Sequence, residues 1–211
     1  MYTPKYFEET NPEVLHELIN EYPFASIICT FNKECEVNHL PLILNKCKTQ
    51  LHGHIAKNNP ITKLVEKDPN TSVIVIFQGP NSYISPSWYP SKHVSGKVVP
   101  TWNYAIVHIA GKLNLTYDLE WIRTHVSELT NRHEQQNTPK WKLDDAPSDY
   151  IQTMLQGIVG VSIEIDNIHG KFKLSQNRSI EDRNEVIKQL SKSNQGSSKA
   201  LFKLMHRNQT R

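Results

Sequence analysis

The sequence lacks several features that identify large classes of protein. Its 211 residues contain no apolar run close to the roughly 20 residues that span a bilayer, so no membrane-spanning helix is expected. Its three cysteines form no Cys-x-x-Cys pair, which excludes a disulfide scaffold and argues against a structural zinc site. The N-terminus lacks the basic-then-apolar order of a signal peptide. We therefore expect a cytoplasmic protein.

A large excess of charge of one sign is also missing. The chain has 24 Lys and Arg against 21 Asp and Glu, which gives a net charge of +3 and a pI of about 8.7. This balance is compatible with an anionic ligand, but without a local cluster it does not by itself argue for nucleic acid. A hydrophobic content of 37% is enough for a packed core and excludes a disordered chain.

Familiar catalytic and nucleotide-binding motifs are absent as well. Without Gly-x-Ser-x-Gly, Gly-x-Gly-x-x-Gly or a Walker-type loop, an α/β-hydrolase, a Rossmann dinucleotide site and NTP hydrolysis are not supported. Ten histidines, among them His39, His52, His54 and His108, raise the possibility of a metal or haem site, but their spacing matches no ligand motif. The sequence identifies no catalytic residue and no metal ligand.

The distribution of apolar residues predicts a mainly β protein of the α+β class. The first strands are separated by short turns, which favours an antiparallel barrel with peripheral helices over a doubly wound sheet. Strands are expected at residues 24–31, 37–44, 50–56, 71–78, 98–115 and 158–165, the fifth interrupted by Pro100 and Gly111. Helices are expected from Asn11-Pro12, from Asn59-Pro60 to Lys67, at 118–133, from about Ser148, and from Ser179.

One segment combines a strand, a helix start and a lysine. Lys57 lies where a predicted strand runs into the helix that begins at Asn59-Pro60. A helix N-terminus attracts anions through its unpaired backbone N–H groups and its dipole, and a lysine can supply the countercharge of a phosphate. His52 and His54 share one face of the strand and could donate further hydrogen bonds. The alternative is an ordinary helix cap with an exposed lysine.

Two segments are rich in aromatic residues, prolines and hydroxyl groups. Residues 79–92 contain Trp88 and Tyr89, and residues 97–104 contain Trp102. Large aromatic side chains among prolines suggest a rigid, partly open pocket that stacks a planar ligand. A packed loop or a subunit interface would use the same residues, and the local pattern does not decide between these readings.

The C-terminal part is basic and contains a linker-like stretch. Residues 191–199 are rich in Ser, Asn, Gln, Gly and Lys, so we expect a basic, flexible tail at 191–211 after a domain of residues 1–190. A helix at 179–190 and a short helical stretch at 199–206 could contact DNA phosphates. Their connection is looser than the turn of a helix-turn-helix motif, which leaves a solvated charged tail as the alternative.

Seven segments of the chain resemble the PaiB family, whose members are described as FMN-binding negative transcriptional regulators. The segments follow in order over nearly all of residues 1–190 and leave the tail outside. They are Met1–Phe7, Asn38–Leu42, Gly53–Pro60, Ile76–Pro80, Tyr83–Lys92, Lys97–Tyr104 and Gly170–Arg178.

This resemblance implies an FMN-binding split β-barrel of the flavin-reductase and pyridoxamine-oxidase type, a homodimer with flavin pockets between its subunits. The FMN phosphate would be held at the strand-to-helix turn, and the ring would meet backbone groups of the preceding strand and two residues of the partner subunit. The cofactor-binding residues would be Asn38, His39, Leu40, His54, Lys57, Asn58, Trp102 and Asn103, with Trp88 and Tyr89 shaping the mouth of the pocket. Split-barrel oxidases commonly carry an arginine in the strand that leads to the phosphate. Here Lys57 is the charged residue of that stretch.

Three functions follow from this resemblance and from the residues. The first is repression of sporulation and degradative-enzyme genes, with DNA as a partner. The second is a flavin-dependent oxidoreductase acting on a small planar substrate beside Trp102, since flavin itself carries hydride chemistry. The third, a haem-binding protein on the same fold, rests on fold analogy and the strand histidines.

Overall fold

The computed structural model describes residues 1–31, 34–68 and 70–209. Its residues cluster into two compact units, each assembled from separate stretches of the chain. The first unit comprises residues 1–18, 78–107 and 169–211, and the second comprises residues 19–77 and 108–168.

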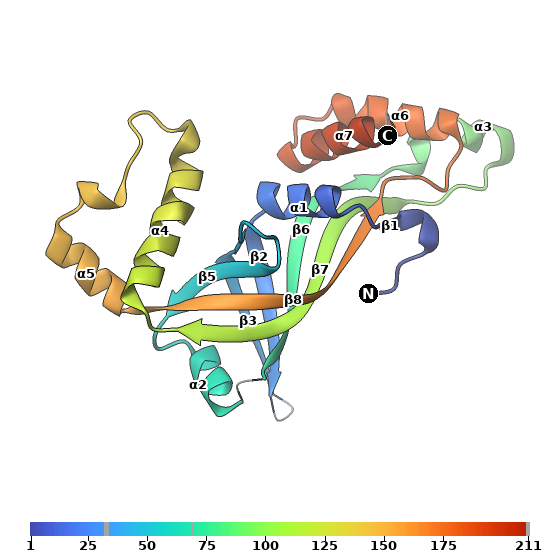
Figure 1. Ribbon diagram of the computed structural model, residues 1–211. Helices are drawn as coiled ribbons and strands as arrows, with labels where there is room; N and C mark the ends of the chain where they lie inside the picture. The colour runs from blue at the N-terminus through green and yellow to red at the C-terminus, as the bar shows by residue number, and fades with distance from the viewer. Residues whose placement is uncertain (32–33, 69, 210–211) are drawn as a thin grey trace. The chain divides into compact units, whose positions relative to one another are not determined.

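The strands of the described residues form an eight-stranded sheet (Figure 1). Their order is β3-β2-β6-β7-β8-β5-β4, and β1 pairs with β8. The pairs β1–β8, β2–β3, β2–β6, β4–β5 and β5–β8 are all antiparallel, which confirms the predicted strand arrangement. The strands are β1 (Glu8–Glu9), β2 (Phe24–Phe31), β3 (Glu34–Pro41), β4 (Ile43–Leu44), β5 (Gln50–Ala56), β6 (Ser72–Ile84), β7 (Thr101–Thr116) and β8 (Ile158–Lys173).

Seven α-helices accompany the sheet in the same described ranges. They are α1 (Pro12–Glu21), α2 (Pro60–Lys67), α3 (Ser91–Ser95), α4 (Leu119–His133), α5 (Ser148–Gln156), α6 (Ile180–Ser191) and α7 (Gly196–Gln209). None of these described helices combines the length and the apolar character that a bilayer crossing requires.

Side-chain caps start several helices where the sequence predicts them. The Asp118 carboxylate accepts a hydrogen bond of 2.9 Å from the N–H of Glu120 at the start of α4. The Ser179 hydroxyl accepts one of 3.2 Å from the N–H of Asp182 at the start of α6. Such caps satisfy N–H groups that have no partner inside the helix, so the cap residue fixes where the helix begins.

Four predicted strands differ in extent from the structure. The strand expected at residues 37–44 is wrong as a single element, because β3 ends at Pro41 and pairs with β2, whereas β4 pairs with β5. β6 runs to Ile84 and β8 to Lys173, each well beyond the apolar run that reveals it in the sequence. The predicted interruption of β7 at Gly111 is wrong, because the strand continues through this residue. Once a strand is paired on both sides, ladder hydrogen bonds hold polar stretches in it that the apolar pattern does not identify.

Helix α7 occupies the segment expected to be a flexible tail. Its side chains Leu201 and Met205 are fully buried, and Figure 1 shows the helix beside α6. Arg183 of α6 donates a hydrogen bond of 3.2 Å to the side chain of Asn208 in α7. The boundary of the barrel domain at residue 190 stays a prediction.

Gly111 is required by a close approach of backbones in the second unit. A Cβ atom at this position would lie 2.1 Å from the carbonyl oxygen of Glu164 in β8 and 2.9 Å from the side chain of Ile163. Neither the oxygen nor the strand that carries it can move without disturbing the ladder, so a side chain here forces β7 and β8 apart.

We therefore expect Gly111→Ala to lower the free energy of unfolding by about 1–3 kcal/mol, the usual cost of overpacking a fixed interior. Gly196→Ala is the matched control, because a Cβ at that position meets no atom within 4 Å. Urea unfolding followed by circular dichroism measures both. Equal stability of the two variants would contradict the close approach.

Candidate functional site

Strand β5 presents two histidines and ends at the turn that carries Lys57. Its residues alternate in burial, so that His52 and His54 share the partly buried face. Antiparallel pairing with β8 sets His54 opposite Gly160. Directly after the strand, the backbone N–H of Lys57 donates to the carbonyl oxygen of Gly157 at 2.9 Å. The position of Lys57 is therefore fixed by the same pairing that holds β5 in the sheet.

Asn59 joins this turn to strand β3. Its side-chain oxygen caps α2 by accepting a hydrogen bond of 3.0 Å from the N–H of Ile61. Its side-chain nitrogen donates at 2.6 Å to the side-chain oxygen of Asn38 in β3. The structure thus brings together two segments, around Asn38 and Lys57, that are separate in the sequence and that the resemblance assigns to one cofactor.

The backbone donors of the turn are more occupied than the sequence pattern predicts. The N–H of Asn59 donates to the carbonyl of Ala56 at 2.9 Å, and the N–H groups of Lys57 and Ile61 are used as described above. The expectation of unpaired backbone N–H groups is therefore wrong for these three. The free donors of the turn are instead the exposed side chains of Lys57 and Asn58.

The surroundings of Lys57 restrain its ammonium group. The nitrogen lies 6.0 Å from the centre of the Tyr117 ring, within the range of a cation–π contact. The Tyr117 hydroxyl donates to a carboxylate oxygen of Glu66 in α2 at 2.5 Å, and this hydrogen bond raises the pKa of the tyrosine. The backbone of Lys57 therefore precedes α2, while its ammonium group lies over Tyr117, whose hydroxyl binds Glu66 near the other end of this helix.

The two further β3 residues of the prediction differ in exposure. His39 is exposed, and its ring lies 2.9 Å from the hydroxyl of Ser26 and stacks on Phe24. Leu40 is buried in the core with 5% of its surface exposed. Leu40 can therefore offer a ligand only its backbone groups, which is the contact that the resemblance implies.

Behind His54 lies His125 of α4, a residue that the sequence analysis does not single out. The two rings are 5.4 Å apart, and His125 also stacks on Trp121 at 5.4 Å. A side chain at Gly160 would collide with the Trp121 ring, so this glycine makes room for the stack. The available sequence signal was the position of His125 on the apolar stripe of α4, three residues after Ile122.

His54 and His125 form a histidine cluster, and burial keeps both rings neutral. His125 is 2% exposed, and among the described residues neither of its ring nitrogens, nor Nδ1 of His54, has a hydrogen-bond partner. Burial lowers the pKa of His125 to about 4, with His54 and His52 as smaller contributors, and burial also lowers the pKa of His54. In the described ranges, no group of three or more His, Cys, Asp or Glu side chains is arranged to hold a metal ion.

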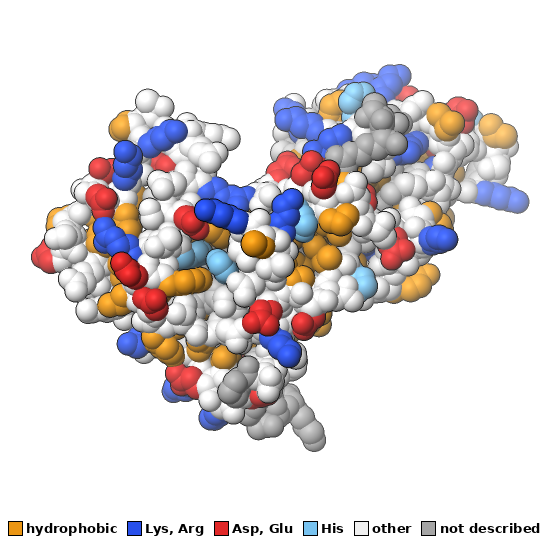
Figure 2. All heavy atoms as spheres, viewed as in Figure 1, with side chains coloured by type: hydrophobic (Ala, Val, Ile, Leu, Met, Phe, Trp, Pro, Cys, Tyr) orange, Lys and Arg blue, Asp and Glu red, His pale blue; other side chains and the backbone are white. Residues whose placement is uncertain are grey.

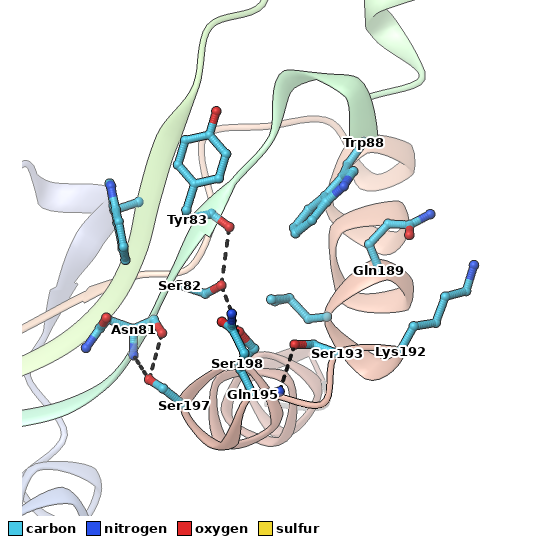
Figure 3. Close-up of a pocket in the computed structure, with 12 residues that line it drawn as sticks. Asn81, Ser82, Tyr83, Trp88, Gln189, Lys192, Ser193, Gln195, Ser197 and Ser198 are labelled. Atoms are coloured by element: carbon cyan, nitrogen blue, oxygen red, sulfur yellow. Dashed lines mark hydrogen bonds between the residues drawn. The ribbon is translucent and has the colours of Figure 1, made fainter.

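A pocket of about 600 Å³ lies in the first unit (Figure 3). Trp88 and Trp102, both expected to contact a ligand, line it together with Tyr83. Tyr89 and Asn103 are buried instead, at 1% exposure each. The Arg178 guanidinium lies 4.7 Å from the centre of the Tyr89 ring, and the Asn103 side chain donates to the hydroxyl of Ser175 at 2.8 Å.

Residues 1–167 match the protein family described as "Putative FMN-binding domain". The chain is 33% identical over 207 residues to "Protease synthase and sporulation protein PAI 2" of Bacillus subtilis (strain 168), over 97% of this chain and 96% of that protein. It is 30% identical over 223 residues to an uncharacterized protein of Emericella nidulans, over 89% of each chain.

Two solved structures of flavoproteins share the fold. The FAD and haem binding protein from Mycobacterium smegmatis has a TM-score of 0.62 at 13% identity, over 84% of this chain and 78% of that one. The flavocytochrome Anf3 from Azotobacter vinelandii has a TM-score of 0.59 at 12% identity, over 87% of this chain and 78% of that one. The predicted split β-barrel is therefore confirmed, and at these identities the likeness extends to the fold alone.

The burial of His125 makes stability depend on pH in a defined direction. The unfolded chain protonates its histidines below about pH 6.5, whereas folded His125 stays neutral to a pKa of about 4. The free energy of unfolding is therefore fully retained above pH 6.5 and falls as the pH drops toward 4. Protonation of His125 accounts for about 3 kcal/mol of this fall.

Replacing His125→Phe keeps the stacking on Trp121 but removes the titration. We expect a flatter dependence of the unfolding free energy on pH, measured by urea unfolding between pH 7.5 and pH 4. The exposed His93, changed to Gln, serves as the control and should retain the wild-type slope. An unchanged slope in His125→Phe would show that this residue is not held neutral.

Proposed function

This chain belongs to the PaiB family of FMN-binding proteins, and we propose that it is a negative regulator of transcription built on an FMN-binding split barrel. Its similarity to the Bacillus subtilis sporulation protein, over 97% of this chain, is the observation that carries the proposal. The proposed targets are genes of sporulation and of degradative enzymes, and the proposed location is the cytoplasm.

FMN is the cofactor that fits this family. The turn between β5 and α2, residues 57–59, is suited to its phosphate and is called the Lys57 turn below. Lys57 supplies a positive charge, Asn58 an exposed amide, and His54 a buried ring nitrogen without a partner among the described residues. Because the nearby backbone N–H groups are largely paired, these side chains would have to provide most of the hydrogen bonds. The backbone of residues 38–40 would meet the ring, and the bond from Asn59 to Asn38 sets the spacing between the two contacts.

We propose that two chains complete each flavin site. Trp102, whose side chain is 54% exposed, is available to approach a flavin bound at Lys57 of the partner protomer. Asn103 is buried next to Ser175, so its side chain would support the strand that carries Trp102. This arrangement assigns both residues to the flavin site, as the family resemblance implies.

Helices α6 and α7 are the proposed contact with DNA. Lys192, Lys199 and Lys203 are exposed there and could reach phosphates. On the face seen in Figure 2, basic side chains lie among acidic ones without forming one continuous basic surface. We propose that the interaction consists of phosphate contacts from these three lysines.

An oxidoreductase is the second candidate, favoured by the open pocket that carries Trp88 and Trp102. Bound FMN would supply the hydride chemistry. The chain's own contribution would be to stack a small planar substrate on these side chains and to limit the access of water.

The phosphate contact predicts a strong effect of Lys57→Ala on FMN binding. Loss of one charge-assisted hydrogen bond costs about 1.5–3 kcal/mol, so the dissociation constant should rise roughly ten- to a hundredfold. Quenching of FMN fluorescence measures it. Lys57→Arg should recover most of the affinity, and Lys63→Ala, at an exposed position of α2, should leave it unchanged. If Lys57→Ala binds FMN as well as the wild type, the phosphate lies elsewhere.

The regulatory role predicts DNA binding that weakens steeply with salt. DNA from upstream of sporulation and degradative-enzyme genes should shift in a gel at lower protein concentration than scrambled DNA of the same length. In Lys199→Gln/Lys203→Gln, the slope of log K against log salt should fall by about 2, close to one unit per lost phosphate contact. Equal binding of both DNAs at moderate salt would rule out direct repression.

A further inference from the structure

The 600 Å³ pocket of the first unit is built from two segments far apart in the sequence. One wall comes from the end of β6, the loop after it and the start of β7, and the other from the α6–α7 connection. This connection lies beyond residue 167, where the match to the FMN-binding family ends. The pocket therefore has a wall that the family match does not include.

Aromatic faces dominate the first wall. Figure 3 shows Trp88 pointing toward the centre of the pocket, with Tyr83 on the opposite side. Tyr83 is 46% exposed and meets the Trp102 ring edge-on at a centroid distance of 6.1 Å. Aromatic rings on both sides of a cavity, Tyr83 exposed and Trp88 half-buried, suit a flat ring, which stacks on them and loses its contact with water.

Hydroxyl groups line the second wall and attach α7 to β6. The Ser82 and Ser198 hydroxyls are 3.0 Å apart. The Ser197 hydroxyl donates to the carbonyl of Asn81 at 2.7 Å and accepts from its N–H at 2.9 Å. These bonds place the first turn of α7 in the pocket wall and leave a polar edge beside the aromatic faces (Figure 3).

The charge of the pocket is positive. Of the described residues that line it, Lys192 alone is charged. Figure 3 shows its side chain leaving the end of α6 with the ammonium group on the side away from Tyr83, so it must turn inward to meet a ligand. The start of the 14-residue helix α7 adds the positive end of a helix dipole on the same side. With no lining carboxylate, the pocket disfavours cations and favours an anionic group near the α6–α7 connection.

We propose that this pocket binds a small planar heteroaromatic molecule that carries one anionic group. The ring stacks between Trp88 and Tyr83, its polar edge meets the polar side chains of the α6–α7 connection, and the anion lies toward Lys192. Aromatic carboxylates and nucleoside monophosphates share this chemistry. The pocket belongs to the first unit and Lys57 to the second. Trp102 is shared with the proposed flavin contact, but the ligand stacks on Trp88 and Tyr83, so the proposal does not require bound FMN.

Two matched pairs of probes test the charge and the source of the ligand. Nicotinate is compared with uncharged nicotinamide, and AMP with adenosine, by isothermal titration calorimetry on the full chain without FMN. We expect at least one of the anions to saturate the protein, and to bind at least about threefold more tightly than its uncharged partner. The anion that binds identifies the carboxylate or the nucleotide class. If none of the four probes binds up to millimolar concentration, or if the uncharged partners bind as well, the proposal is overturned.

Two variants with controls localise the binding. Lys192→Gln should abolish the preference for the anion, whereas Lys140→Gln, exposed in the second unit and outside the pocket, should keep it. Trp88→Leu should weaken binding about tenfold through lost stacking, whereas Trp141→Leu in the second unit should not.

Saturating FMN should leave the affinity of the pocket for the probe unchanged. If FMN competes with the probe, the pocket is part of the flavin site and the proposal of a separate ligand is wrong.

Discussion

The candidate cofactor site depends on the pairing of β5 with β8. This ladder runs from Gln50 to Ala56 without a break, and the bond from the Lys57 N–H to Gly157 continues it into the turn. It fixes the alternation that turns His54 toward His125 of α4 and places Lys57 in the turn before α2. The cap of that helix, Asn59, then binds Asn38, so two strands and one helix converge on the same turn. A shift of β5 by one residue would reverse its faces and disperse the site.

The buried histidine His125 and the serines at the start of α7 are two kinds of polar group with different surroundings. Around His125, burial without a protein hydrogen-bond partner among the described residues keeps the imidazole neutral, which costs stability at low pH. In the first unit, the serines at the start of α7 are satisfied by β6 and leave aromatic faces open. The second unit thus offers the exposed Lys57 in the turn before α2, and the first unit offers a surface suited to stacking.

Much of the local structure could be predicted, because it follows from nearby residues. The cap at Asp118, the Asn59-Pro60 helix start and the strand at 50–56 each have a short-range cause. The extent of β6 and β8 could not be predicted, since it depends on ladder partners distant in the sequence. The clustering of Asn38 with Lys57, the role of His125 and the burial of Asn103 are likewise tertiary. Serine-rich composition suggests a loose linker at 191–199, yet two of its serines attach α7 to β6.

The central claim is that this family member holds FMN by its phosphate at the Lys57 turn. Comparing FMN with riboflavin tests it most directly, because the two share the ring system and differ in the phosphate. Titrating the purified chain with each flavin and following the quenching of flavin fluorescence gives both dissociation constants. The account predicts that FMN binds at least about tenfold more tightly than riboflavin, the value of one charge-assisted phosphate contact. Equal affinities, or no retention of either flavin, would contradict it.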